Sequence, residues 1–442
     1  MNSSQPSSQP IHQFRRFLAK WLSYRRNLVG MAITIAFGII LYAKIALTQQ
    51  PIQLNVMMSA LDAAQAQSVV QQFEEQNPNI QVNLIEGPNA TNLVEDLYTS
   101  SFLLGDSPYD LIAMDVVWLP KFAAANWLID LTDRIPEEEL TDFLPADLEG
   151  GRYEGRLYRL PYRTDAGMLY YRSDLLEEAG LEPPETFEDL LNASRTIQEA
   201  GGATWGYVWQ GRQYEGLAAM FVEVLAGAGG YWINPETLEV GLDQPEAIEA
   251  INFLRSTVGE GVSPPGVTTY QEEEARRLFQ GGNSVFMRNW PYAFPLGNSE
   301  DSPIQGRFGI KPMVHAAGET GAGCIGGWGL GISNTTAHPD EALEVVRFFA
   351  SEEAQKLMAL ENGYLPTRES LYSDPDILER YPYYSGLLEV VQNGVLRPPV
   401  AQYAQASDIL QRYLSSALTG RTSPEEAMQL AANETRILLG RS

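Results

Sequence analysis

The stretch Ser284–Phe294, which reads SVFMRNWPYAF, places two large aromatic rings beside side chains that form hydrogen bonds. Its apolar start predicts a short buried strand, and Pro291 must end that strand because proline has no backbone N–H to donate. Trp290 and Tyr292 are therefore expected at the carboxyl end of a strand, where open α/β sheets bind ligands. The alternative interpretation is that both rings fill the core, where aromatic side chains are usually buried.

Other stretches carry the same mixture of rings, carboxylates and arginine. The segment Gly206–Gly216 (GYVWQGRQYEG) interleaves aromatic and polar residues, which favours a binding loop with Gln210, Tyr214 and Glu215 as its candidates. Flat rings cover the C–H faces of a sugar, carboxylates accept protons from its hydroxyls, and arginine donates to neighbouring oxygens. A set suited to that chemistry consists of Asp115, Asp165, Glu215, Trp290, Tyr292, Trp328 and Arg397.

The elements that precede and position these residues follow an α/β pattern. We expect strands at Ile52–Met58, Ile80–Ile85 and Tyr109–Met114 and helices at Leu61–Gln76 and Leu93–Leu104. Strands that alternate with helices in this way are typical of a parallel sheet. Asp115 ends the last of these strands, where its carboxylate either faces a ligand or caps the next helix, and both interpretations stay open.

Further along the chain, Thr164-Asp165 is expected in an extended connection after Pro161, a place where the chain could cross from one lobe to another. Thr186 and Asp189 have the spacing of a capping box at the start of a helix. Pro339–Asn362 predicts one long amphipathic helix that begins with proline and is followed by glycine.

Metal and cofactor chemistry is not expected. Cys324 is the only cysteine, which excludes an intramolecular disulfide and thiolate-based zinc or iron–sulfur sites. His12, His315 and His338 show no ligand spacing. Gly321–Gly326 (GAGCIG) has the glycine spacing of a dinucleotide loop, but a strand and not a helix is expected after it, so we reject that interpretation. The sequence predicts no catalytic residue, no metal and no cofactor.

Charge is distributed unevenly along the 442 residues. The first 50 hold six basic residues and no acid, which leaves 24 basic and 56 acidic residues in the remainder. An acidic body of this kind repels nucleic acid and anionic lipid headgroups, so neither is an expected partner. The length favours more than one domain.

The N-terminal region predicts export. Leu28–Leu47 is apolar except for Lys44 and reaches the roughly 20 residues that a bilayer requires. Residues 1–27 are basic, so the positive-inside rule places them in the cytoplasm and the body outside the membrane. Residues 28–47 are thus a membrane anchor or, alternatively, a cleaved signal segment, and the export route stays open. No cysteine directly follows the apolar run, which argues against a lipoprotein-type anchor.

Six motifs in order carry a resemblance to a known family: YRTDAGMLYYRSDLL, WQGRQYEGL, FMRNWPYAF, GGWGLGIS, GYLPTR and SPEEAMQL. From about Leu54 to the C-terminus the chain resembles the extracellular solute-binding proteins of carbohydrate ABC importers. It is most similar to the trehalose/maltose-binding branch and, within it, to glucosylglycerol-type binding subunits. The resemblance implies capture of a disaccharide or glycoside and delivery to ABC permease subunits that work with a separate ATPase.

The resemblance also implies a fold and a site. The fold is an α/β, two-lobed periplasmic-binding-protein fold with a hinge and a ligand cleft between the lobes. The implied lobes are residues 51–163 plus 305–352 and residues 164–304 plus 353–442. The implied cleft residues, matched motif by motif, are Asp115, Tyr162, Asp165, Trp290, Tyr292, Gly327, Trp328 and Arg397. Ligand contacts near Ser59–Leu61 and Pro88–Asn92 are left open, because the family's motif there does not align securely with PNATN.

Two other functions remain as alternatives. An exported glycoside hydrolase would use two of the cleft carboxylates as acid and base or nucleophile. A polyamine-binding protein would use acidic and aromatic residues to hold cations. We expect binding without catalysis. The sequence has no G-x-x-x-x-G-K-[ST] loop, so another chain would have to supply the energy of transport.

Overall fold

The computed structural model describes residues 51–440 apart from 106 and 393, together with the isolated positions 16, 20, 21, 25, 31 and 34. The predicted basic segment 1–27 and apolar segment 28–47 otherwise lie outside the described residues. Within the described part of the chain, no helix is both long and apolar enough to cross a membrane. Residues 1–52 and 53–442 form two compact units. In the first unit, the Arg25 guanidinium lies 4.3 Å from the centre of the Trp21 ring.

The first sheet has the strand order β12–β11–β3–β1–β2. β12 and β3 pair with successive parts of β11, and β6 pairs with the other edge of that strand. Its strands are β1 Ile52–Ser59, β2 Ile80–Gly87, β3 Leu111–Asp115, β6 Leu160–Ala166, β11 Cys324–Ile332 and β12 Val395–Leu396. β1 and β3 are parallel, as the strand–helix alternation predicts, and β11 runs antiparallel to β3 and β6. The preceding hairpin is β4 Arg152–Tyr153 with β5 Arg156–Leu157.

The helices associated with this sheet include two pairs, each of which the sequence predicted as one continuous helix. They are α2 Ala60–Gln65, α3 Gln67–Gln76, α4 Thr91–Leu103, α5 Leu119–Ala124, α6 Pro145–Glu149, α13 Pro339–Phe349 and α14 Glu352–Asn362. The helix predicted over 339–362 is interrupted because Ser351 has extended backbone angles and accepts the Ala354 N–H on its side chain. Ser351 thus starts a second helix as its N-cap. The helix predicted over 61–76 is likewise divided, at Ala66.

The second sheet has the order β10–β7–β9–β8. Its strands are β7 Met168–Tyr171, β8 Trp205–Val208, β9 Ser284–Asn289 and β10 Gly309–Lys311. The strand predicted before Pro291 is β9, which ends two residues before that proline. The predicted capping box is confirmed, since Thr186 and Asp189 exchange hydrogen bonds at the start of α8.

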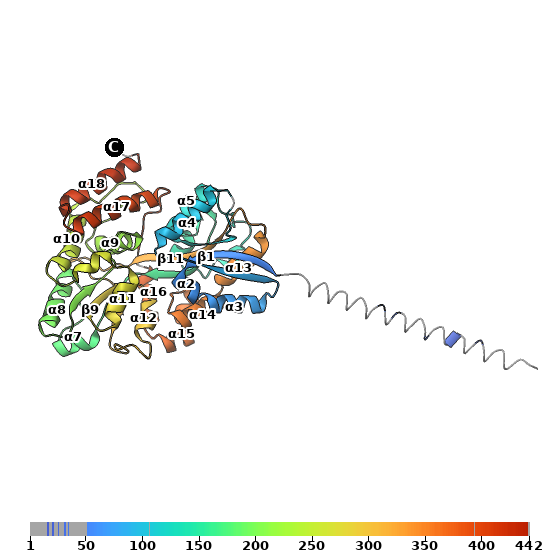
Figure 1. The fold of residues 1–442 in the computed structure, drawn as a ribbon, viewed down its shortest axis with the longest axis horizontal. Coiled ribbons are helices and arrows are strands. Elements are labelled where there is room, and N and C mark those ends of the chain that lie inside the picture. The colour runs from blue at the N-terminus through green and yellow to red at the C-terminus, as the bar shows by residue number, and fades with distance from the viewer. Residues whose placement is uncertain are drawn as a thin grey trace, which may run out of the picture. The chain divides into compact units, whose positions relative to one another are not determined.

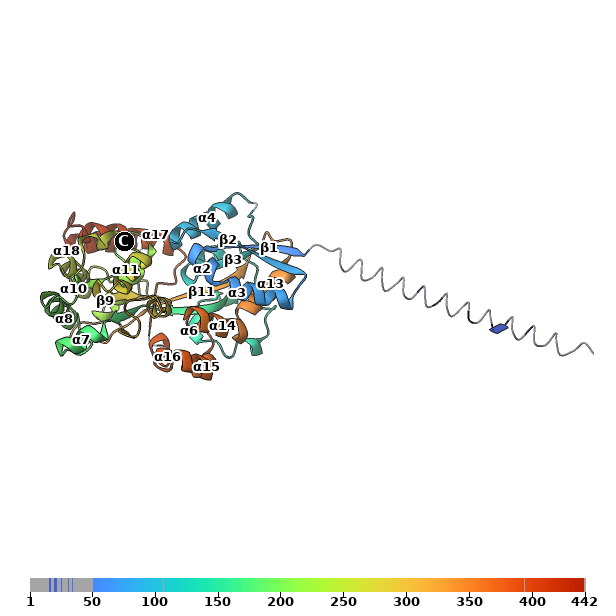
Figure 2. The same cartoon turned by 60° about the horizontal axis from the view of Figure 1, so that its bottom comes forward.

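Helices group around each sheet separately (Figures 1 and 2). Those of the second lobe are α7 Ser173–Ala179, α8 Phe187–Glu199, α9 Glu215–Gly227, α10 Pro245–Gly259, α11 Glu272–Gln280, α12 Ala293–Gly297, α17 Tyr403–Leu418 and α18 Pro424–Leu438. Two further helices, α15 Pro375–Arg380 and α16 Tyr384–Gln392, follow α14. Tyrosines of this region pack in a shared cluster, in which the rings of Tyr381 and Tyr384 stack at 5.5 Å.

Sheet membership differs from the predicted lobe limits at three places. Residues 164–166 are still part of β6 in the first sheet, so Thr164-Asp165 is strand and the crossing follows at Gly167. β10 pairs with β7 of the second sheet, although residues 305–352 were predicted in the first lobe. β12 pairs with β11 of the first sheet, although it falls in 353–442. Pairing partners of two- and three-residue strands depend on tertiary packing, which local periodicity does not report.

A buried ion pair lies where the chain crosses between the sheets. Arg288 of β9 and Glu223 of α9 are both fully buried, and the Arg288 Nε lies 2.8 Å from Glu223 Oε2. Burial by itself would lower the pKa of Arg288, but Glu223 raises it above its usual value. The Cys324 N–H at the start of β11 also donates to Glu223, at 3.2 Å. A Cβ atom at Gly167 would overlap the Glu223 carboxylate, so glycine is required at this crossing.

Candidate functional site

A cavity of about 230 Å³ is lined by residues of both sheets and their helices. The first lobe contributes the ends of β1 and β3 together with β6 and β11. The second lobe contributes the first turns of α9 and α11 and the turn after β9. The predicted ligand residues that line the cavity are Asp115, Asp165, Tyr214, Glu215, Trp290, Tyr292, Gly327, Trp328 and Arg397.

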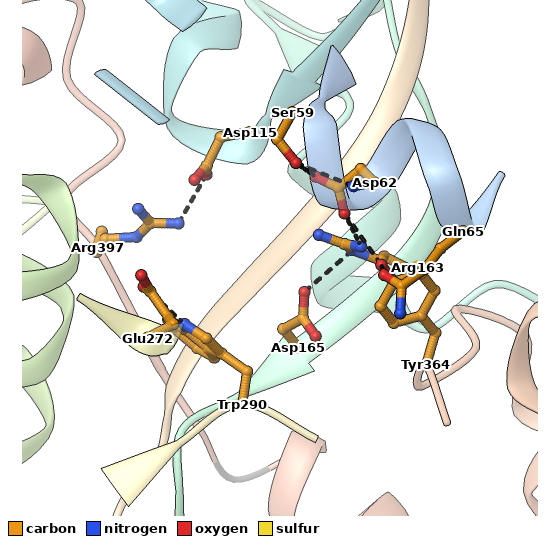
Figure 3. A network of polar contacts seen from close by, with 10 residues as sticks. All are labelled: Ser59, Asp62, Gln65, Asp115, Arg163, Asp165, Glu272, Trp290, Tyr364 and Arg397. Carbon is orange, nitrogen blue, oxygen red and sulfur yellow. Dashed lines mark hydrogen bonds and ion pairs between the residues drawn. The ribbon is translucent and has the colours of Figure 1, made fainter. Parts of the chain in front are cut away.

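Arg397 connects the two lobes at one end of this cavity (Figure 3). Its guanidinium donates to Asp115 Oδ1 at 2.7 Å and to Glu215 Oε1 at 2.8 Å. Arg397 follows β12, which pairs with β11 at Ile325, and Asp115 ends β3, which pairs with β11 at Trp328. The register along β11 therefore brings the arginine to the aspartate. Burial opposes the charge of Arg397, but Asp115 and other neighbouring groups hold its pKa well above the usual range.

Both carboxylate oxygens of Glu215 accept hydrogen bonds from protein groups. Its Oε1 accepts from Arg397 and from the Tyr403 hydroxyl, and its Oε2 accepts from the Ser407 hydroxyl at 2.6 Å. Tyr403 and Ser407 belong to α17, so this carboxylate ties α9 to α17 and fixes Arg397. Its place in the cavity wall is therefore that of a positioning group.

Asp115 shows both arrangements that the sequence left open. Its Oδ1 accepts the Val117 N–H at 3.3 Å and so caps the short helix η1, Val116–Trp118. The same carboxylate lines the cavity and binds Arg397. The two interpretations are compatible because a carboxylate has several acceptor positions.

A second arginine cluster lies at the other end of the residues drawn in Figure 3. Arg163 donates to Asp62 Oδ1 at 2.6 Å and lies 3.3 Å from Asp165 Oδ2. Its guanidinium carbon is 4.2 Å from the Tyr364 ring centre and 5.5 Å from that of Trp328. Burial raises the pKa of Asp165 to about 6, against the opposing effect of Arg163.

Trp290 and Tyr292 line the cavity and are held by acids of α11. The Trp290 Nε1–H donates to Glu272 Oε1 at 3.3 Å, and the Tyr292 hydroxyl donates to Glu273 at 3.0 Å. The Arg288 guanidinium lies 3.9 Å from the Trp290 ring centre and so supports one face of the indole. Trp290 remains half-buried, which fits a cavity wall better than a filled core.

Tyr162 and Gln210, two of the predicted ligand residues, do not line the cavity. Alternate residues of a strand face opposite sides, and in β6 the side that carries Asp165 also carries Arg163. Tyr162 faces the other way and packs edge-on against Phe349, with ring centres 5.7 Å apart. Gln210 is fully buried and donates to the Arg288 carbonyl at 3.0 Å, beneath the site.

The sequence reasoning missed several cavity residues. The main ones are Asp62, Arg163, Glu272 and Tyr364. For Arg163 the two-residue alternation with Asp165 was the available signal. Tyr364 stood in the quoted motif GYLPTR, and Asp62 immediately follows the stretch left open at Ser59–Leu61. Glu272 begins a run of three glutamates that resembles an ordinary solvated helix end, so no local signal marks it.

The described residues contain no group of three or more side chains that could hold a metal ion. The described site instead consists of rings, carboxylates and guanidinium groups. Two lobes of mixed α/β structure around a central cavity define the class of two-lobed periplasmic binding proteins.

Comparisons with known proteins identify the family within this class. Residues 59–356 match the model of the bacterial extracellular solute-binding proteins, so the chain belongs to that family. A probable ABC transporter-binding protein of Deinococcus radiodurans is 34% identical over 368 residues, which cover 81% of this chain and 87% of the relative. The maltotriose-binding protein of Pyrococcus abyssi is 26% identical over 338 residues, covering 75% of this chain and 69% of that protein.

A solved structure confirms the two-lobed fold that the resemblance implied. The maltose-bound MalE3 of T. maritima superposes with a TM-score of 0.84 at 38% identity, covering 88% of this chain and all of that one. The predicted membership in the family of ABC importer binding proteins is likewise confirmed. The family is one of binding proteins.

Proposed function

We propose that this chain is the sugar-binding subunit of an ABC importer, which captures a disaccharide or glycoside of the trehalose, maltose, sucrose or glucosylglycerol class. The observation that carries the proposal is the cavity between the lobes, where aromatic rings alternate with ion-paired carboxylates. The names of the relatives, which bind maltose and maltotriose, support the same ligand class. The loaded protein would deliver the sugar to ABC permease subunits that work with a separate ATPase.

Ligand binding would favour closure because the ligand contacts groups of both lobes. Trp328 and Asp165 belong to the first lobe, whereas Trp290 and Tyr292 belong to the second. A ligand shifts a conformational equilibrium only by its difference in affinity for the two states. A sugar held between these two walls has its full set of contacts only when the lobes are closed.

The body acts outside the cytoplasmic membrane, and residues 28–47 hold it there as an anchor or direct its export as a cleaved segment. Membrane extraction of the expressed full-length chain separates these two forms. An anchored chain stays in the membrane fraction at its full mass, and a cleaved chain is recovered in the soluble fraction without residues 28–47.

The experiment that tests the proposal is titration calorimetry of the full-length chain against trehalose, maltose, sucrose and glucosylglycerol, with spermidine as the control. Saturable heat with a sugar, and no sugar product afterwards, is the expected result. Release of a monosaccharide would favour the glycoside hydrolase alternative. Heat from spermidine with silence from all four sugars would favour the polyamine alternative and remove the sugar proposal.

Sugar affinity should depend on pH through Asp165. Its pKa of about 6 is raised by burial, and a hydroxyl donor favours the ionised carboxylate over the protonated acid. Because the carboxylate takes up a proton as the pH falls through 6, sugar affinity should decrease below that pH, by up to about tenfold per pH unit. Calorimetry at several pH values would measure this, with Asp165→Asn as the control that flattens the profile. An affinity that stays constant down to about pH 5 would contradict it.

A further inference from the structure

Glu272 is a partly buried acid of the cavity wall that differs from the ion-paired acids there, because no arginine or lysine of the described residues pairs with it. Glu274 also lines the cavity without an ion pair, but it is exposed and its carboxylate accepts the Gln271 N–H. Asp62, Asp115, Asp165 and Glu215 all bind Arg163 or Arg397. On α11 itself, Arg276 and Arg277 pair with Glu273, at 2.7 and 3.5 Å. Glu272 receives only the neutral Trp290 Nε1–H, at 3.3 Å. Its negative charge is therefore left to the cavity.

The position of Glu272 is fixed by the end of β9. The Asn289 side chain donates to the Glu272 carbonyl at 3.1 Å, and Trp290 holds one carboxylate oxygen. Glu272 is also the first residue of α11, where the helix dipole favours a carboxylate. The acid is thus ordered by its neighbours in the absence of a ligand, which limits the entropy that binding would cost.

The Tyr214 hydroxyl is the second polar group of the cavity that can bind a ligand. Tyr214 is 3% exposed, its ring lines the same cavity, and its hydroxyl makes no hydrogen bond of regular geometry among the described residues. The ring lies across the start of α9, where Gly216 leaves the room that a Cβ atom would take. Burial raises the pKa of Tyr214, and so do the charge of Glu272 and the approach of the Tyr214 hydroxyl to the Glu272 carboxylate, so the hydroxyl keeps its proton and can donate. A buried hydroxyl without a partner costs free energy unless a ligand satisfies it.

The two buried arginines that line the cavity are already paired, because Arg163 and Arg397 each lie between two carboxylates. Arg277 also lines the cavity, but 68% of its side chain is exposed and its partner Glu273 is 3.5 Å away, so solvent screens its charge. A phosphate or carboxylate ligand needs an arginine or lysine that is free to bind it. Such an anion would instead meet the unpaired charge of Glu272, and like charges repel strongly where water is excluded.

We propose that Glu272 and the Tyr214 hydroxyl form a hydroxyl-binding pair on the second lobe that restricts the ligand to uncharged, polyhydroxylated molecules and excludes phosphorylated or carboxylated glycosides. This inference rests on the proposed sugar-binding function. Glu272 accepts protons from ligand hydroxyls, and Tyr214 donates to a ligand oxygen. The pair thereby determines specificity for the charge class of the ligand as well as part of the affinity.

Calorimetry on the full-length chain tests the proposal with whichever of maltose or trehalose binds the wild type, and with maltose 1-phosphate or trehalose 6-phosphate as its anionic counterpart. Glu272→Gln keeps the size of the side chain and an acceptor for Trp290, but removes the charge. We expect this substitution to lower the affinity for the neutral sugar about tenfold. The ratio of the affinity for the neutral sugar to that for the phosphorylated sugar should fall by at least about tenfold. Tyr214→Phe should weaken the neutral sugar to a similar degree without lowering the melting temperature, because the hydroxyl makes no hydrogen bond of regular geometry in the free protein.

Glu188→Gln is the matched control. Glu188 lies in the first turn of α8 and carries the same charge, but it is exposed and does not line the cavity. Wild-type binding by the control together with weakened binding by Glu272→Gln would support the pair. Wild-type affinity and selectivity in both Glu272→Gln and Tyr214→Phe would overturn it while leaving the sugar-binding function intact. A wild type that binds none of trehalose, maltose, sucrose and glucosylglycerol removes the proposed function and this inference with it.

Discussion

Replacing Glu223 with alanine is expected to lower the melting temperature of the chain by about 5 °C. The substitution would leave the Arg288 guanidinium fully buried without its carboxylate, and such an uncompensated charge costs about 3–5 kcal/mol. The Cys324 N–H would lose its acceptor as well, so the effect would reach the start of β11. Thermal unfolding followed by circular dichroism measures the change.

A surface ion pair provides the control for this prediction. Arg412 and Glu434 lie 2.8 Å apart with about two-fifths of each side chain exposed, so Glu434→Ala should cost less than about 1 kcal/mol. The double replacement Glu223→Leu with Arg288→Met removes both charges and should recover much of the lost stability. Equal melting temperatures for Glu223→Ala and Glu434→Ala would show that the buried pair does not stabilise the crossing.

Replacing Trp290 with alanine is expected to weaken sugar binding by more than about 100-fold while the free protein stays folded. The indole lines the cavity, lies on Arg288 and positions Glu272, so its loss removes a stacking surface and releases an acceptor at once. Because the ring is half-buried and not part of the close-packed core, the melting temperature should fall by only a few degrees.

Trp290→Phe separates the two contributions of this residue. Phenylalanine keeps a stacking surface but cannot donate to Glu272, so its affinity should fall between those of the wild type and Trp290→Ala. A collapse of the melting temperature in Trp290→Ala would instead support the interpretation that the ring fills the core.

Local signals in the sequence predicted much of the fold. The proline that ends β9 and the capping box at Thr186 act within a few residues, so they could be recognised directly. The break at Ser351 was missed although serine followed by two glutamates is itself a helix-start pattern, because the longer apolar periodicity dominated the interpretation. Sheet membership of β10 and β12 depends on partners far away in the chain and had no local signal.

The candidate site was predictable to a similar extent. The family motifs predicted Trp290, Asp165 and Arg397, which line the cavity, and also Tyr162, which does not. Arg163 lines the cavity because it lies on the same side of β6 as Asp165. Glu272 could not have been distinguished from its two neighbouring glutamates without the contact to Trp290, which comes from the next strand. The ion pairs of Arg163 and Arg397 likewise join residues from different elements, so they can be recognised only in the structure.

The most direct test of sugar capture between the lobes is a crystal structure of this protein with the sugar that gives saturable heat. We expect one sugar between the lobes, with a ring face on Trp290, hydroxyls at Asp165 and Glu272, and contacts to residues of both sheets. A sugar that contacts one lobe only would contradict it. So would a sugar in the separate cavity lined by Gln65, Pro295 and Arg380 with the central cavity empty.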